Sequence, residues 1–187
     1  MVKINSCVFI SGKGSNLKSL LNNSRNYNFP INIRLVVSNK KNAQGLNVAK
    51  KYSIPFEVIN VKNTLYEIKI LKQLQKKKIT LICLAGYMKI LSNKFIKRFN
   101  GKIINIHPSL LPKYRGMNTF KRVLRDKEKF SGCSVHYVSN KLDAGKIILQ
   151  KKFFVSKNET VETLKLKTQR KEYRAFSEAI TKIYMTS

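Results

Sequence analysis

The chain has 187 residues, 43% of them hydrophobic and 25% charged, which is typical of one soluble globular domain and excludes a disordered chain. Its 38 Lys and Arg residues against 9 Asp and Glu residues give a formal net charge of +29, which first suggests nucleic-acid binding. No apolar run reaches the roughly 18 residues of a membrane span, so we expect no membrane association.

The positive charge has a simpler explanation than nucleic acid. Lys accounts for 30 of the 38 basic residues and occurs with 18 Asn and 19 Ile residues, all encoded by A/T-rich codons. Sites that grip phosphate favour Arg, because its planar guanidinium donates two parallel hydrogen bonds. We therefore expect a basic surface produced mainly by codon bias, with no specific nucleic-acid partner but a general attraction for small anions.

The cysteines and the N-terminus indicate the compartment. Cys7, Cys83 and Cys133 are far apart, and two of them lie in apolar runs, which favours buried free thiols over a disulfide or metal site. The N-terminus lacks the apolar segment of a secretory signal. We expect a cytoplasmic protein without a bound metal.

The first part of the chain alternates strand and helix patterns. A β-branched run over residues 3–10 leads through a glycine turn into the helical spacing of Leu17, Leu20 and Leu21. The strands expected next are 31–38, 56–61, 79–87 and 102–107, and the helices are 44–52, 65–78 and 92–99. Thr64 and Glu67 have the spacing of a capping box for the helix at 65–78. The alternation predicts an α/β fold with a mostly parallel central sheet and helices on both faces.

After residue 107 the pattern changes. A proline-containing loop over 108–116 precedes a helix near 118–127, strands at 133–139 and 146–155, and a final helix at 161–184. The sequence has no repeat, linker or low-complexity segment, which favours a single domain over residues 1–187.

The glycine turn after the first strand is a candidate phosphate site. Gly12 and Gly14 permit tight backbone geometry, and the free amides of the following helix, with the side chains of Ser15 and Asn16, can donate to an anion. Leu17 stands where a dinucleotide fingerprint has its third glycine. The turn therefore suits a phosphate monoester. The alternative is a plain glycine turn with Ser15 as the helix N-cap.

Asn105 and His107 form a second candidate site. They lie two residues apart on an expected strand, so their side chains point to the same face at its carboxyl end, where open α/β sheets bind ligands. His107 is one of two histidines in the chain. A buried structural histidine is the alternative.

Four segments, in their order and spacing, resemble the phosphoribosylglycinamide formyltransferase family: ISGKGSNL (10–17), LAGYMKILS (84–92), NIHPSLLPKY (105–114), and SVHYV (134–138) followed by LDAGKIILQ (142–150). The resemblance implies a Rossmann-like formyltransferase fold, with a phosphate-binding half over 1–100 and a catalytic and folate-binding half over 101–187. It also implies transfer of the formyl group of the cosubstrate 10-formyltetrahydrofolate to the amino group of glycinamide ribonucleotide, in purine biosynthesis.

The resemblance implies roles for the matching residues. Asn105 and protonated His107 would stabilise the oxyanion formed on attack of the amine, and Asp143 would raise the pKa of His107 and relay protons. His136 is expected to support the site. The substrate contacts implied are Gly14, Ser15, Asn16, Gly86, Pro108, Asn118, Gln169 and Glu172. The folate contacts implied are Met88, Lys89, Ile90, Leu91, Asn140, Lys141 and Asp143.

The chain also departs from the family pattern. Lys89 stands where many relatives have Arg, and Phe120 stands where the family often has His. Methionyl-tRNA formyltransferases share the Asn-x-His and Asp arrangement but need a further C-terminal domain, for which no residues remain here. A degenerate formyltransferase fold that only binds polyanions would be expected to have lost these three residues. We expect an enzyme acting on small molecules, as a monomer or a homodimer.

Overall fold

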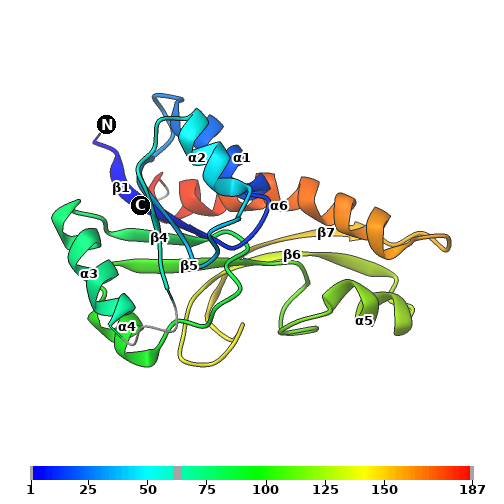
Figure 1. The fold of residues 1–187 in the computed structure, drawn as a ribbon. Helices are drawn as coiled ribbons and strands as arrows, with labels where there is room; N and C mark the ends of the chain where they lie inside the picture. Colours follow the sequence, from blue (N-terminus) through cyan, green and yellow to red (C-terminus); the bar gives the residue numbers. More distant parts are fainter. Residues whose placement is uncertain (1, 61–64, 186–187) are drawn as a thin grey trace. The chain divides into compact units, whose positions relative to one another are not determined.

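The structure is a computed structural model that describes residues 2–60 and 65–185 (Figure 1). Its strands lie in one seven-stranded sheet in the order β3-β2-β1-β4-β5-β6-β7, which confirms the expected α/β class. By compactness the chain divides into two units, Met1–Ile104 and Asn105–Ser187, with the boundary inside β5 (Lys102–His107). The single domain over 1–187 stays a prediction.

The first unit contains parallel strands joined by helices. Its elements before β5 are β1 (Ile4–Ile10), α1 (Ser15–Ser24), β2 (Ile31–Ser38), α2 (Gly45–Lys51), β3 (Phe56–Val58), α3 (Tyr66–Lys76), β4 (Leu81–Leu84) and α4 (Asn93–Arg98). β1 pairs in parallel with β2 and β4, and β2 pairs in parallel with β3. Figure 1 shows α1 and α2 together on one side of these strands and α3 and α4 together on the other. Both faces of the central strands are therefore covered.

Burial explains why the central strands read as continuous apolar runs. The side chains of β1 from Cys7 to Ile10 are buried, because a parallel strand with helices on both faces has no solvent side. Leu17, Leu20 and Leu21 form the buried face of α1. Phe9 packs edge to face on Tyr87, with ring centroids 5.2 Å apart. Tyr87 is thus a core residue.

Two strands of the first unit end earlier than expected. β4 ends at Leu84 rather than at residue 87, because Gly86 has a φ of 74° that no strand accommodates, although the flanking residues are buried. β3 ends at Val58, and residue 61 lies outside the described residues. Thr64 of the expected capping box also lies outside them, so the capping box stays a prediction, and the Glu67 carboxylate accepts hydrogen bonds from Ser92.

The second unit is built on an antiparallel pair of strands. It contains the end of β5, then α5 (Thr119–Arg125), β6 (Phe130–Tyr137), β7 (Ile147–Phe154) and α6 (Val161–Met185). β6 pairs with β7, with an irregularity in register between Val135 and His136. α6 packs along β6 and β7 and buries its apolar face, which includes Leu164 and Phe176 (Figure 1).

Two further expectations concern the cysteines and membrane helices. Cys7, Cys83 and Cys133 are buried free thiols, as predicted. None of the helices in residues 2–60 and 65–185 is long and apolar enough to cross a membrane.

Candidate functional site

The carboxyl ends of β1, β2 and β4 bring together the first group of expected site residues. The chain leaves β1 toward β2 on one side, whereas β4 lies on the other side, and open α/β sheets bind ligands at such a reversal of strand order. The Ser11 hydroxyl donates to Asn39 Oδ1 at 2.6 Å and accepts from the Met88 N–H at 2.8 Å. Ser11 thus ties together the segments that follow all three strands. The sequence signalled Ser11 only as part of the glycine turn.

Gly14 determines the shape of the turn after β1. It has a φ of 75° and is the N-cap of α1, so the alternative of Ser15 as N-cap is wrong. A Cβ at this position would lie 2.5 Å from Gly45 Cα, so only glycine fits. Ser15 and the buried Asn16 begin α1, where the backbone amides of the first turn and the positive end of the helix dipole favour an anion.

The segment after β4 carries the other expected residues of the first unit. Gly86 has a φ of 74°, and an added Cβ would meet no atom within 4 Å, so the backbone there is open to a ligand. Met88, Lys89 and Ile90 are exposed, which leaves two apolar side chains available on the surface. Leu91 is buried, so its side chain belongs to the core.

Asn105, His107 and Asp143 come together in the second unit, as the sequence predicted. His107 Nδ1 lies 3.3 Å from Asp143 Oδ2, and Asn105 Nδ2 donates to Asp143 Oδ1 at 3.3 Å. His107 and Asp143 are buried, at 6% and 9% exposure. Asp143 has a φ of 47°, which directs its carboxylate toward β5 from a tight loop.

His136 completes this cluster from β6. Its Nδ1 lies 2.9 Å from the carbonyl oxygen of Tyr137, and its Nε2 lies 3.1 Å from Asn105 Nδ2. Since a carbonyl only accepts, Nδ1 carries the proton and Nε2 accepts from the Asn105 amide. Both amide hydrogens of Asn105 are therefore directed, one at His136 and one at Asp143. This agrees with the expected supporting role of His136.

The loop after β5 contributes two backbone groups that sequence reasoning missed. The Tyr114 carbonyl accepts from His107 Nε2 at 2.8 Å, and the Gly116 N–H donates to Asp143 Oδ2 at 2.9 Å. Every residue has a carbonyl and nearly every residue an N–H, so neither contact has a signature in residue type. A proline-containing loop directly after the Asn-x-His pattern was the one available signal.

Burial and neighbouring charges act in opposite directions on the pKa values of the cluster. Burial lowers the pKa of His107, and the Tyr114 carbonyl and Asp143, which raise it, do not offset that effect. Asp143 therefore raises the pKa of His107, as expected, but burial outweighs this effect and the net direction is downward. Burial raises the pKa of Asp143, but the nearby His136, the hydrogen bond from the Gly116 N–H and the charge of His107 together bring it below its ordinary value. Asp143 is thus an ionised carboxylate, and His107 faces an acceptor at each ring nitrogen, contacts that suit the imidazolium although burial lowers its pKa.

The other expected residues of the second unit lie outside these contacts. Pro108 is half-buried after β5, and Asn118 is the exposed N-cap of α5, with a φ of 57° and no side-chain cap bond. Asn140 and Lys141 are exposed in the loop before Asp143. On α6, Gln169 is half-buried and Glu172 is buried, where its charge helps to raise the pKa of Cys133.

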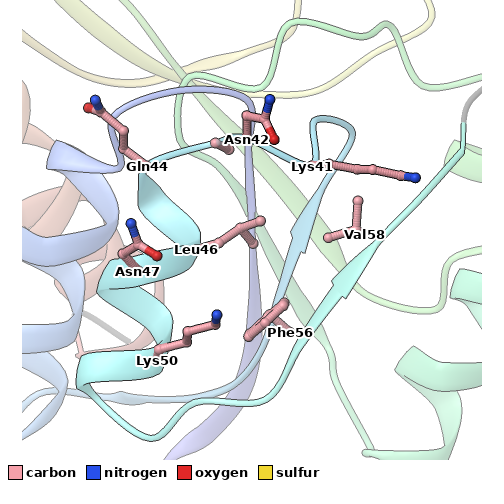
Figure 2. A pocket seen from close by; sticks show the side chains of 9 residues that line it. Lys41, Asn42, Gln44, Leu46, Asn47, Lys50, Phe56 and Val58 are labelled. Carbon is pink, nitrogen blue, oxygen red and sulfur yellow. The ribbon is translucent and has the colours of Figure 1, made fainter.

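One pocket lies apart from the expected residues. It has a volume of about 220 Å³ and lies between α2 and β3, with Lys41, Leu46, Lys50 and Phe56 among its lining residues (Figure 2). None of the residues expected to bind substrate or folate lines it. Within residues 2–60 and 65–185, no three His, Cys, Asp or Glu side chains are grouped to hold a metal ion.

The chain is similar to known proteins over nearly its whole length. Residues 4–180 match the model of the formyl transferase family. The chain is 41% identical to the phosphoribosylglycinamide formyltransferase of Haemophilus influenzae, covering 90% of this chain and 82% of that protein. It is 42% identical to the trifunctional purine biosynthetic protein adenosine-3 of Gallus gallus, covering 95% of this chain but only 18% of that protein.

Solved structures give the same result. The phosphoribosylglycinamide formyltransferase of Brucella melitensis superposes with a TM-score of 0.92 at 38% identity, covering 97% of this chain and 95% of that chain. The enzyme of the same name from Campylobacter jejuni superposes with a TM-score of 0.91 at 34% identity, covering 98% of each chain.

Proposed function

Because this chain belongs to the formyl transferase family, and within it to the phosphoribosylglycinamide formyltransferases, we propose that it formylates glycinamide ribonucleotide, with 10-formyltetrahydrofolate as the donor. The chain is an enzyme of one-carbon transfer that serves purine synthesis. Its products are formylglycinamide ribonucleotide and tetrahydrofolate. The observation that carries the proposal is the cluster that the half-buried Asn105 forms with the buried His107 and Asp143.

Asp143 is suited to move the proton that the reaction must transfer. The substrate amine forms a bond to the formyl carbon, the bond from that carbon to N10 of the folate breaks, and one proton passes from the amine to N10. A carboxylate that is ionised at rest can accept this proton, directly or through a water molecule. His107 Nδ1 and the Gly116 N–H both face Oδ2 and orient the carboxylate.

Asn105 is suited to stabilise the oxyanion of the tetrahedral intermediate. The hydrogen bond from Asn105 Nδ2 to Asp143 Oδ1 measures 3.3 Å between these two atoms, longer than the usual 2.9–3.0 Å. When Asp143 takes up a proton, its oxygen becomes a weaker acceptor, and this amide hydrogen is freed for the developing negative charge. Proton transfer and oxyanion stabilisation would then be coupled through one side chain.

The remaining site residues are assigned by chemistry. Gly14, Ser15 and Asn16 offer the amides of a helix N-terminus to the substrate phosphate, and the open backbone at Gly86 extends this surface. The segment at Met88, Lys89 and Ile90 offers backbone groups and exposed apolar side chains to the folate. Folate contacts at Asn140 and Lys141 and substrate contacts at Pro108, Asn118, Gln169 and Glu172 stay predictions, as does a role for Leu91.

The activity is tested directly with purified protein. We expect release of the deformylated folate product from the formyl donor only when glycinamide ribonucleotide is present, followed by absorbance. His107→Ala and Asp143→Asn should each lower kcat by roughly 10²- to 10⁴-fold, the range for loss of a positioned acid or base. Glu162→Gln, at an exposed acid on α6, serves as the matched control and should retain full kcat.

A different acceptor would contradict the proposal. If the wild-type protein leaves glycinamide ribonucleotide unchanged but formylates aminoacylated initiator tRNA, it is a methionyl-tRNA formyltransferase. If it binds polyanions and turns over neither acceptor, the fold serves binding alone. A cytoplasmic location and a monomer or homodimer without specific nucleic-acid binding remain part of the proposal, supported by the buried free thiols for the reducing compartment.

A further inference from the structure

The loop between β5 and α5 is strained where it meets the catalytic cluster. Tyr114 has a φ of 58° and Gly116 a φ of 77°, both in the left-handed region. A residue with a Cβ costs roughly 1 kcal/mol or more in this conformation, so it persists only where surrounding contacts hold it. These two residues carry the carbonyl that binds His107 and the N–H that binds Asp143.

Arg122 on α5 makes the contacts that hold this loop. Its Nη1 donates to the Arg115 carbonyl at 2.6 Å and lies 3.5 Å from the Met117 carbonyl. Its guanidinium carbon lies 5.2 Å from the centroid of the Tyr114 ring, within cation–π range. One half-buried side chain therefore contacts the residues on both sides of Gly116 and the ring of Tyr114.

We propose that Arg122 is a positioning residue for formyl transfer, which clamps residues 114–117 so that the Tyr114 carbonyl and the Gly116 N–H meet His107 and Asp143. The inference rests on the proposed function of the cluster. Arg122 acts through the backbone of the loop and need not touch either substrate.

The shape of the side chain matters as well as its charge. A guanidinium is planar, so it can stack on the Tyr114 ring while its N–H groups reach carbonyls at its edge. A lysine ammonium is a compact point charge that keeps the positive charge but not this combination. The Tyr114 hydroxyl lies 2.9 Å from both Asp126 Oδ2 and Glu128 Oε1, which fixes the hydroxyl end of the ring.

A second consequence of the location is electrostatic. The groups that act on His107 are Asp143 and the Tyr114 carbonyl, which raise its pKa, and His136 and Arg122, which lower it in addition to burial. Removal of the guanidinium charge should therefore raise the pKa of His107, whereas a lysine at this position should leave it nearly unchanged. The effect of the Arg122 clamp on the loop and the effect of its charge on the pKa of His107 can therefore be measured separately.

The test compares Arg122→Ala and Arg122→Lys with the control Lys121→Ala, which removes an exposed charge from the same helix. We expect kcat to fall roughly 10- to 100-fold in Arg122→Ala, with a smaller change in KM, because misplacement of catalytic groups by about 1 Å has this effect. Arg122→Lys should recover only part of this loss. Lys121→Ala should match the wild type.

NMR gives a readout that does not depend on turnover. The chain has only two histidines, so the imidazole signals of His107 and His136 can be followed separately through a pH titration. We expect the pKa of His107 to rise in Arg122→Ala and to stay close to the wild-type value in Arg122→Lys and Lys121→Ala. The Gly116 amide signal should shift in both Arg122 variants, because its bond to Asp143 loosens.

The outcomes separate this inference from the proposed function. Wild-type kcat in Arg122→Lys together with an unmoved Gly116 amide would overturn the clamp, and this variant also decides the case if Arg122→Ala does not fold. If the wild-type protein formylates no acceptor, the proposed function fails. The Gly116 amide and the His107 titration would still reveal whether Arg122 holds the loop.

Discussion

Asn105 is the residue on which the second-unit cluster converges. Its amide nitrogen reaches His136 at 3.1 Å and Asp143 at 3.3 Å, so the orientation of the amide is set by two acceptors. His136 is fixed in turn, because its Nδ1 faces the Tyr137 carbonyl. A buried histidine with one ring nitrogen already hydrogen-bonded is held rigidly, and its other nitrogen is an acceptor in a fixed position. Such a neighbour keeps the Asn105 amide oriented to donate to the oxyanion.

At the residue scale, we predict that His136 sets the rate through Asn105. His136→Ala removes the acceptor and should lower kcat by roughly 10- to 100-fold, with less effect on KM, because the amide loses its fixed orientation. His136→Gln, whose side-chain oxygen can reach the same amide, should restore part of the rate. Steady-state kinetics measure both. Equal rates in folded wild type and His136→Ala would exclude this role.

The sequence predicted the side chains of the cluster but not its backbone partners. Spacing and resemblance identified Asn105, His107 and Asp143, because these residues are of a rare type or lie in a recognisable sequence pattern. Asp143 raises the pKa of His107, as predicted, but burial of the ring lowers it by more, and that burial depends on packing that no local pattern encodes.

At the scale of elements, α1 and α2 meet at two glycines. Gly45 begins α2, and its N–H donates to the Gly12 carbonyl at 3.0 Å. Gly14 lies against the Cα of Gly45. The turn after β1 is therefore held by the helix after β2. The close approach leaves the amides at the start of α1 in a fixed position, as a phosphate site requires.

We predict that Gly14→Ala destabilises the first unit. The substitution places a Cβ 2.5 Å from Gly45 Cα at a φ of +75°, and the strained conformation and the backbone clash together should cost about 2 kcal/mol or more. Urea unfolding measures the loss. Gly12→Ala is the control: its Cβ would meet nothing within 4 Å, and it should change stability by less than about 0.5 kcal/mol. Equal stability of the two variants would contradict the prediction.

Element boundaries followed from the sequence where hydrophobicity and backbone agree. Strands 31–38 and 102–107 were predicted with the bounds that the structure has. The apolar run at 79–87 contains a strand of only four residues, because the turn at Gly86 ends the strand while the residues on either side of that glycine stay buried. The capping box of Thr64 and Glu67 stays a prediction. The hydrogen bond that Glu67 accepts from Ser92, the N-cap of α4, is a long-range contact that local spacing cannot reveal.

At the scale of the whole molecule, the net charge of +29 far exceeds what the proposed ligands need. A ribose phosphate and a folate carboxylate are small anions, and only a few lysines can contact them. The surplus raises the encounter rate of any anionic ligand without adding specificity. The charge therefore says more about the composition of the chain than about its reaction.

We predict that DNA binds this protein only nonspecifically. A long duplex should bind at low salt, and its association constant should fall steeply on a log-log plot against salt concentration, because binding is driven by counterion release. Fluorescence anisotropy with unrelated sequences measures this. A preference for one sequence that persists at physiological salt would contradict the prediction and revive the nucleic-acid alternative.

The three buried cysteines make the protein a reporter of its own local unfolding. Cys7 and Cys83 lie in the first unit and Cys133 in the second, and burial raises the pKa of each thiol, that of Cys133 to about 12. A thiol that is both shielded and protonated reacts with an alkylating reagent only when its surroundings open. The labelling rates of these cysteines therefore measure the opening of each unit separately, without any engineered probe.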